Sequence, residues 1–178
     1  MNYYKPKEAV QEFALSGIYK SSLPVSKFII LAILGGAFIA FGGLLSVIVA
    51  GGIPGVGEVN PGLVKFTAGA LFPVGLIMVS LTGADLFTSD CAGLTYPLLQ
   101  RKIKAATFCK LLLLSYVFNF AGAQIVAFLL SSEVGLLDKD PWQVYLHTYS
   151  EAKVNQDFLK VFIKGIGANW LVCLGMLM

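Results

Sequence analysis

Charged residues are scarce in this chain, and so are the residue types that build most catalytic and metal sites. Asp, Glu, Lys and Arg make up 13% of the 178 residues, and the chain has a single His. Its three Cys are far apart and form no Cys-x-x-Cys pair, so neither a disulfide framework nor a metal site is indicated. Because no nucleophile lies beside a base and no phosphate-binding loop appears, we expect a protein that is not an enzyme and that uses no cofactor.

Apolar residues, in contrast, are far more frequent than a soluble core of this size requires. They make up 57% of the chain, and 19 residues are Gly. Uncharged runs approach the ~20 residues that a helix needs to cross ~30 Å of hydrocarbon. We therefore predict an all-α integral membrane protein with a single membrane domain, 1–178. Its expected parts are an amphipathic cytoplasmic segment (1–27), span 1 (28–50), a broken span 2 (66–99), span 3 (107–132), an outer loop (133–157) and span 4 (158–178).

The basic residues between these runs predict the orientation of the chain. Four lysines precede the first span and four basic residues lie between the second and third apolar runs, whereas the loop after the third span is mainly acidic. Basic residues gather on the cytoplasmic side of membrane proteins, so we place the N-terminus in the cytoplasm. The net charge of +3 follows this topology and does not indicate a nucleic-acid partner.

The second apolar run is interrupted by polar residues at membrane depth. Pro73 lies within it, Gly83 ends its regular pattern, and the stretch 82–90 carries carboxylate and hydroxyl side chains. Non-helical backbone at this depth is tolerated only where protein buries it or where it lines a polar cavity. We therefore predict a helix, a loop at about 83–90 and a short second half-helix, with the helix ends at the depth where a solute would bind.

The stretch Gly83-Ala-Asp-Leu-Phe-Thr-Ser89 resembles the signature of the formate/nitrite transporter family, and three more stretches resemble that family's motifs: Asn119 to Ala123, Ala152 to Val154 and Gly165 to Leu174. The resemblance implies an aquaporin-like bundle of six spans in two inverted repeats, assembled as a homopentamer in the bacterial cytoplasmic membrane. The sequence ends at its fourth expected span. The family's second broken helix, with the pore histidine, and its sixth span are not found among these residues, so either the sequence is a fragment or the pore is incomplete as written. His147 of the outer loop is not expected to be the pore histidine.

The resemblance also implies a substrate pathway. It makes Lys153 the family's functional lysine, whose charge would attract an anion and favour its protonation. It places the hydroxyl of Thr88 at the central chamber, where it can donate to an anion or accept from a protonated acid. Without the resemblance, Lys153 would read as a solvated loop residue and Thr88 as a capping residue.

Leu86, Phe72 and Leu76 would form hydrophobic constrictions by the same resemblance, although apolar residues of membrane helices more often face lipid or the core. A bare anion pays a large desolvation cost in a dry constriction, whereas its neutral conjugate acid does not. Conduction with transient protonation of the substrate is therefore expected.

Four polar residues are expected to support the loop. An ionised Asp85 in the pore would repel an anion, so we expect its carboxylate to accept backbone N–H groups and hold the loop in shape. Ser89 is expected to stabilise the turn. Asn119 and Asn169 are mid-span amides that can bond the free backbone groups of the loop or another helix.

The function expected from the sequence is a channel for small monovalent anions in the lipid bilayer, with formate first and nitrite or hydrosulfide next. A proton-coupled carrier on the same fold is one alternative. The other is a neutral-solute pore of the aquaporin kind, which would give Lys153 no role and little pH dependence.

Overall fold

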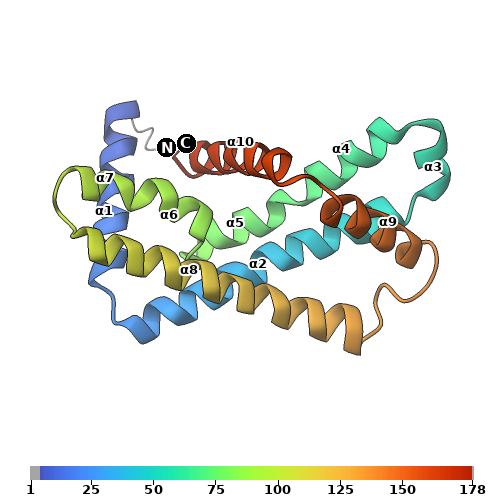
Figure 1. Cartoon of the computed structure of the whole chain (residues 1–178), viewed down its shortest axis with the longest axis horizontal. Coiled ribbons are helices and arrows are strands. Elements are labelled where there is room, and N and C mark those ends of the chain that lie inside the picture. Colours follow the sequence, from blue (N-terminus) through green and yellow to red (C-terminus); the bar gives the residue numbers. More distant parts are fainter. Residues whose placement is uncertain (1–4, 178) are drawn as a thin grey trace.

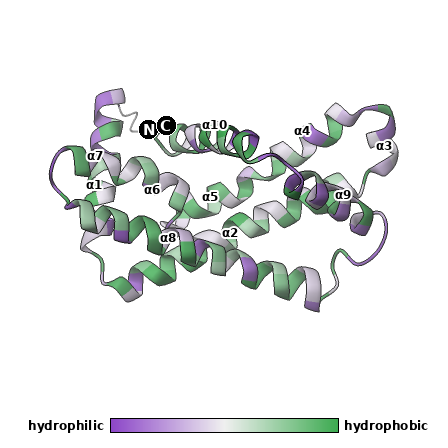
Figure 2. Cartoon of the chain, viewed as in Figure 1, coloured by the Kyte–Doolittle hydropathy of each residue, from purple (hydrophilic) through white to green (hydrophobic). Residues whose placement is uncertain are grey.

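The computed structural model describes residues 5–177, and over that range its regular elements are all helices. Four helical stretches are long and apolar enough to cross a membrane: Val25–Gly51, Pro61–Thr82, Ala105–Glu133 and Phe158–Leu177. They run along the long axis of the molecule (Figure 1), and their apolar middle parts lie between more polar ends (Figure 2). The prediction of an all-α membrane protein is confirmed. Residues 1–4 of the expected N-terminal segment and residue 178 of span 4 lie outside the described residues.

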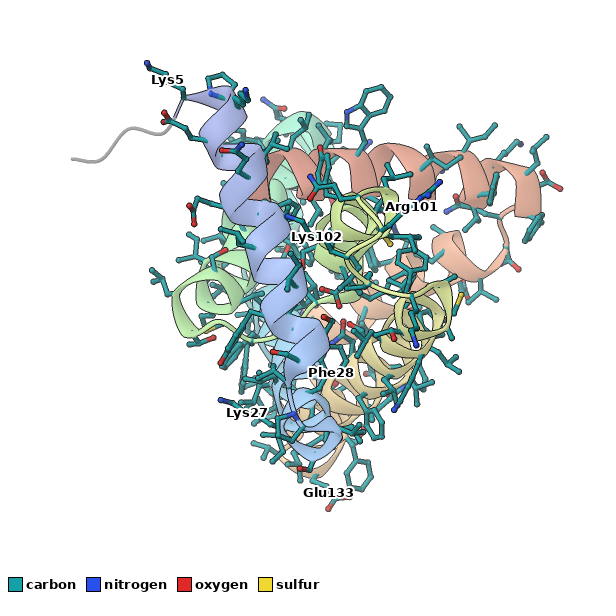
Figure 3. All side chains as sticks on the ribbon, turned by 90° about the vertical axis from the view of Figure 1, so that its left-hand side faces the viewer. Lys5, Lys27, Phe28, Arg101, Lys102 and Glu133 are labelled. Carbon is teal, nitrogen blue, oxygen red and sulfur yellow. The ribbon has the colours of Figure 1, made fainter. Side chains whose placement is uncertain are left out.

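Helix α1 (Pro6–Ser22) lies across one end of the long helices instead of running beside them (Figure 1). It starts where Glu8 accepts a hydrogen bond of 2.9 Å from the backbone N–H of Lys5. Its buried residues are Ala14 and Gly17, and a Cβ added at Gly17 would overlap the carbonyl group of Gly93. Figure 3 looks onto this end of the bundle, where the labelled Lys5, Lys27, Arg101 and Lys102 are found.

Helix α2 (Val25–Gly51) is the centre of the bundle, and α8 (Ala105–Val126) packs along it. Glycines allow the two backbones to meet directly. A Cβ added at Gly36 would overlap the carbonyl of Asn119, and a Cβ added at Gly122 would overlap that of Ile33. Small residues allow this close contact in lipid, where apolar burial alone gives helices little reason to associate.

The second span is broken after its first two helices. Asn60 caps α4 (Pro61–Leu71) by accepting from the N–H of Leu63, and α5 (Pro73–Thr82) continues α4 with helical backbone at Phe72. Gly83 then adopts a left-handed conformation with φ of +69°, which ends the helix. After an extended Leu86 the chain forms α6 (Phe87–Gly93) and α7 (Thr95–Leu99).

The loop is therefore shorter than the sequence predicted, covering 83–86 instead of 83–90. Thr88, Ser89 and Asp90 lie in the first turn of α6. The N–H of Phe87, which a helix start leaves without an intrahelical partner, donates to Oδ1 of Asn119 at 2.8 Å. This external partner allows the helix to begin four residues earlier than the polar residues suggested.

The opposite end of the bundle holds α3 (Pro54–Val59) and α9 (Trp142–Val154), with a π-helical stretch, Ala127–Glu133, extending α8. The indole N–H of Trp142 donates to the carbonyl of Ile48 at 2.8 Å and fastens α9 to the end of α2. Helix α10 (Phe158–Leu177) packs beside α6 but has no buried residue of its own.

Candidate solute site at the helix break

The backbone of the loop 83–86 is held by the neighbouring helices. The N–H of Asp85 donates to the carbonyl of Leu31 on α2 at 3.0 Å. Gly35, one turn later on α2, has no Cβ, and a Cβ there would overlap the carbonyl of Asp85. The loop therefore rests directly on the backbone of α2, and only a residue without a side chain fits beneath it.

Asn119 on α8 binds both sides of the break. Its Nδ2 donates to the carbonyls of Asp85 at 2.9 Å and Ala32 at 2.7 Å, while its Oδ1 accepts from the N–H of Phe87. One amide thus uses a donor and an acceptor on two backbone groups beside the break, and its second donor on a carbonyl within α2. These contacts join α2, the loop and the start of α6.

The carboxylate of Asp85 has different partners from those expected. Instead of accepting backbone N–H groups, it accepts the hydroxyl of Ser115 at 2.8 Å through Oδ2, and its Oδ1 lies 2.7 Å from Nζ of Lys20. The physical reason is burial. The Asp85 side chain is 1% exposed, and a buried carboxylate is stabilised more by an opposite charge than by neutral hydrogen-bond donors. The hydroxyl of Ser89 donates to the carbonyl of Leu86 at 2.8 Å and stabilises the turn.

Sequence reasoning treated Lys20 only as one of the basic residues of the cytoplasmic side and did not single out Asp90. The Nζ of Lys20 also donates to Oδ1 of Asp90 at 2.6 Å, so one ammonium group contacts two carboxylates. Burial lowers the pKa of Lys20, but the carboxylates of Asp90 and Asp85 outweigh this effect and raise it above the ordinary value. A signal was present, because Lys20 follows the buried Ala14 and Gly17 at helical spacing and so shares their face.

Thr88 faces α10. Its backbone carbonyl accepts the thiol of Cys173 at 3.2 Å. Asn169 lies one turn before Cys173, and its Oδ1 is buried without a hydrogen-bond partner among the described residues. Asn169 therefore makes no hydrogen bond to the loop through its Oδ1. The Oδ1 of Asn119, in contrast, accepts from the N–H of Phe87 next to the loop.

The three apolar pathway residues have different surroundings. Leu86 is 7% exposed beneath α6, whereas Phe72, between α4 and α5, is 44% exposed. Leu76 is half-buried, and its side chain lies near Gly175 of α10. Phe72 and Leu76 are one turn apart on the same side of the second span.

Lys153 lies away from these residues. It is exposed in the last turn of α9, and its Nζ is 5.1 Å from the centre of the Tyr149 ring, in a cation–π contact. Among the described residues, no hydrogen bond, ion pair or cation–π contact joins Lys153 to Thr88 or to the constriction residues.

A cavity of about 220 Å³ lies under the loop on the side of α1. Polar groups of three elements line it, among them Lys20, Asp85 and Ser89. Apolar residues of α2, α5 and α10 complete the wall, including Leu31, Val79 and Met176. The volume is that of a small solute with a few water molecules.

Comparison with known proteins identifies a family that the sequence matches over almost its whole length. The sequence model of a family described as formate/nitrite transporter matches residues 7–178. A probable formate transporter of Methanothermobacter thermautotrophicus is 34% identical over 187 residues, which cover 97% of this chain and 68% of the relative. The formate channel BtFdhC of Bacillus thuringiensis is 35% identical over 99% of this chain and 66% of its own length. The uncharacterized transporter YrhG of Bacillus subtilis is 36% identical, with 98% and 64% covered.

The chain thus spans about two thirds of the length of these relatives. The matched residues 7–178 include nearly all of α1, the broken second span and α10. It is a match to a family of membrane transporters and not of enzymes. This chain belongs to the formate/nitrite transporter family.

Proposed function

We propose that the protein conducts small monovalent anions across a membrane, with formate as the first substrate and nitrite or hydrosulfide as the next. The observation that supports this most directly is the break at Gly83 to Leu86. It presents non-helical backbone, a buried ionic cluster and the start of α6 within a bundle of apolar helices. Membrane proteins tolerate such backbone where a solute pathway runs.

The proposed pathway passes between the broken span and α10. Thr88 and Asn169 supply polar groups on facing helices, and Leu76 and Leu86 supply the apolar constriction. Phe72 would narrow the pathway on the outer side. An anion would lose much of its hydration at the leucines, so transient protonation of the substrate lowers the barrier there.

Lys153 is proposed to act from the outer mouth. Its ammonium group is exposed and would raise the local concentration of anions, an effect that acts over a Debye length of about 8–10 Å at ordinary salt and does not require contact. The choice of formate rests on two relatives that are named a probable formate transporter and a formate channel.

Assembly and location are proposed on the same basis. We expect a homopentamer in the bacterial cytoplasmic membrane, with the N-terminus and the basic end shown in Figure 3 in the cytoplasm. No residue of α10 is fully buried, so its exposed apolar side chains need a cover, which neighbouring subunits and the third of the relatives' length that this chain does not match would provide. Native mass spectrometry in detergent should show the pentamer, and a protein that is monomeric throughout would contradict it.

The activity is tested by flux into liposomes at several pH values, with formate, nitrite and hydrosulfide measured in parallel. Lys153→Glu should reduce formate flux sharply, and Lys153→Arg should keep part of it because the charge is retained. Lys139→Glu is the matched control, because Lys139 is exposed in the same outer region.

Three outcomes would contradict the proposal in different ways. Equal formate flux for wild type and Lys153→Glu would remove the lysine from the mechanism. Glycerol flux without anion flux would indicate a neutral-solute pore. Anion uptake that requires a proton gradient and saturates would indicate a proton-coupled carrier on this scaffold.

A further inference from the structure

Two buried carboxylates share a single ammonium group beneath the helix break. The side chains of Asp85 and Asp90 are 1% and 0% exposed, and the Oδ1 atom of each lies within 2.7 Å of Nζ of Lys20. The two carboxylates therefore face each other across one cation. If both are ionised, the cluster keeps one negative charge that no described residue neutralises.

The hydrogen bonds of the cluster are also incomplete. Ser115 donates to Oδ2 of Asp85, but Oδ2 of Asp90 is buried and has no hydrogen-bond partner among the described residues. No charged group besides Lys20 and Asp85 contacts Asp90 in the described part of the chain. Other titratable groups lie nearby on three packed elements: Tyr19 of α1 lines the same cavity, Cys91 of α6 follows Asp90, and Cys173 of α10 contacts the carbonyl of Thr88.

One proton bound by the two carboxyl groups would remove both the unneutralised negative charge and the shortage of hydrogen-bond donors. It would reduce the net charge of the cluster to zero, and it would turn one carboxyl oxygen from an acceptor into a donor toward the other carboxyl group. Two carboxyl groups that share a buried site do not both ionise readily, because the second negative charge is repelled by the first.

We propose that Lys20, Asp85 and Asp90 form a buried proton-binding site on the inner side of the helix break, which holds one proton while Lys20 is charged. Lys20 and Asp85 line the cavity of about 220 Å³, so the proton can exchange with water that enters there. This proton belongs to the protein and not to the transported anion. The inference does not rest on the proposed transport activity, since proton binding is measured without any anion substrate.

Infrared spectroscopy of the full chain in lipid nanodiscs tests the site. At neutral pH, exposed carboxyl groups are ionised, so the carbonyl stretching band of a protonated carboxyl group should report buried ones. Wild type should show the equivalent of one such group per chain. Asp90→Asn should lose this band, whereas Glu58→Gln, which removes an exposed carboxylate at the other end, should keep it.

A second variant covers the case in which Asp90→Asn does not fold. Lys20→Met removes the ammonium group, and the band should then increase toward two carboxyl groups per chain. Absence of the band in wild type, or a full band in a folded Asp90→Asn protein, would overturn the proposal. Loss of the wild-type band when sodium replaces a bulky organic cation would also overturn it, because a metal ion would then be the resident ligand.

Discussion

Replacement of Asn119 by Ala should weaken the helix break more than any other single amide change. The side chain makes three hydrogen bonds, two to carbonyl groups and one from the N–H of Phe87. At ~0.5–1.5 kcal/mol net for each bond, with an added penalty for a buried N–H left unpaired, the loss amounts to about 2–5 kcal/mol.

Asn60→Ala is the matched control. Asn60 makes a single side-chain hydrogen bond, to the N–H of Leu63 at the exposed start of α4. Loss of such a cap costs ~0.5–2 kcal/mol. Asn119→Ala should therefore reduce the free energy of unfolding by about 2.5 to 4 times as much as Asn60→Ala does.

The measurement is equilibrium unfolding in detergent, followed by tryptophan fluorescence, with formate flux into liposomes as a second readout. We expect Asn119→Ala to lower both stability and flux and Asn60→Ala to leave flux near wild type. If the two variants are equally stable and equally active, the hydrogen bonds of Asn119 do not hold the loop and the reasoning is refuted.

Three more changes test separate contacts. Gly35→Ala places a Cβ against a backbone carbonyl of the loop and should abolish assembly. Gly69→Ala, with open space around it, should be neutral or slightly stabilising. Size-exclusion profiles and melting curves would show both effects. Thr88→Val keeps the shape and removes the hydroxyl, so formate flux should fall while the melting temperature stays within error; unchanged flux would exclude the hydroxyl from the pathway. Trp142→Phe removes the hydrogen bond to Ile48 and should destabilise α9 by ~0.5–1.5 kcal/mol, detected as faster proteolysis of the segment 133–157.

The sequence predicted those features that depend on local patterns. Apolar runs identified the membrane class, and Gly83 marked the end of α5, because a left-handed residue in a membrane helix favours glycine. The predicted loop was too long, since its polar residues suggested irregular backbone up to Asp90, whereas α6 begins at Phe87. The N–H that begins α6 at Phe87 is satisfied by a residue 32 positions away, and no local pattern reports such a partner.

Lys20 was missed for the same reason. By composition it is one of several lysines before the first span, and a basic residue there is explained by orientation in the membrane. Its contact with Asp90 joins residues 70 positions apart, and it depends on how α1 crosses the bundle. Lys153 and Thr88 lie on α9 and α6, which occupy different places along the bundle (Figure 1), and motif spacing in the sequence does not give such positions in space.

The partners of the loop have a consequence for the order of biosynthesis. Lys20, Leu31, Ser115 and Asn119 all precede residue 120, so every residue that holds the loop has been synthesised before α9 and α10. The loop 83–86 can therefore make these contacts in the membrane before α10 has been inserted. Helix α10 then arrives at a surface that is already formed, and a defect in it should leave an early intermediate with an intact loop.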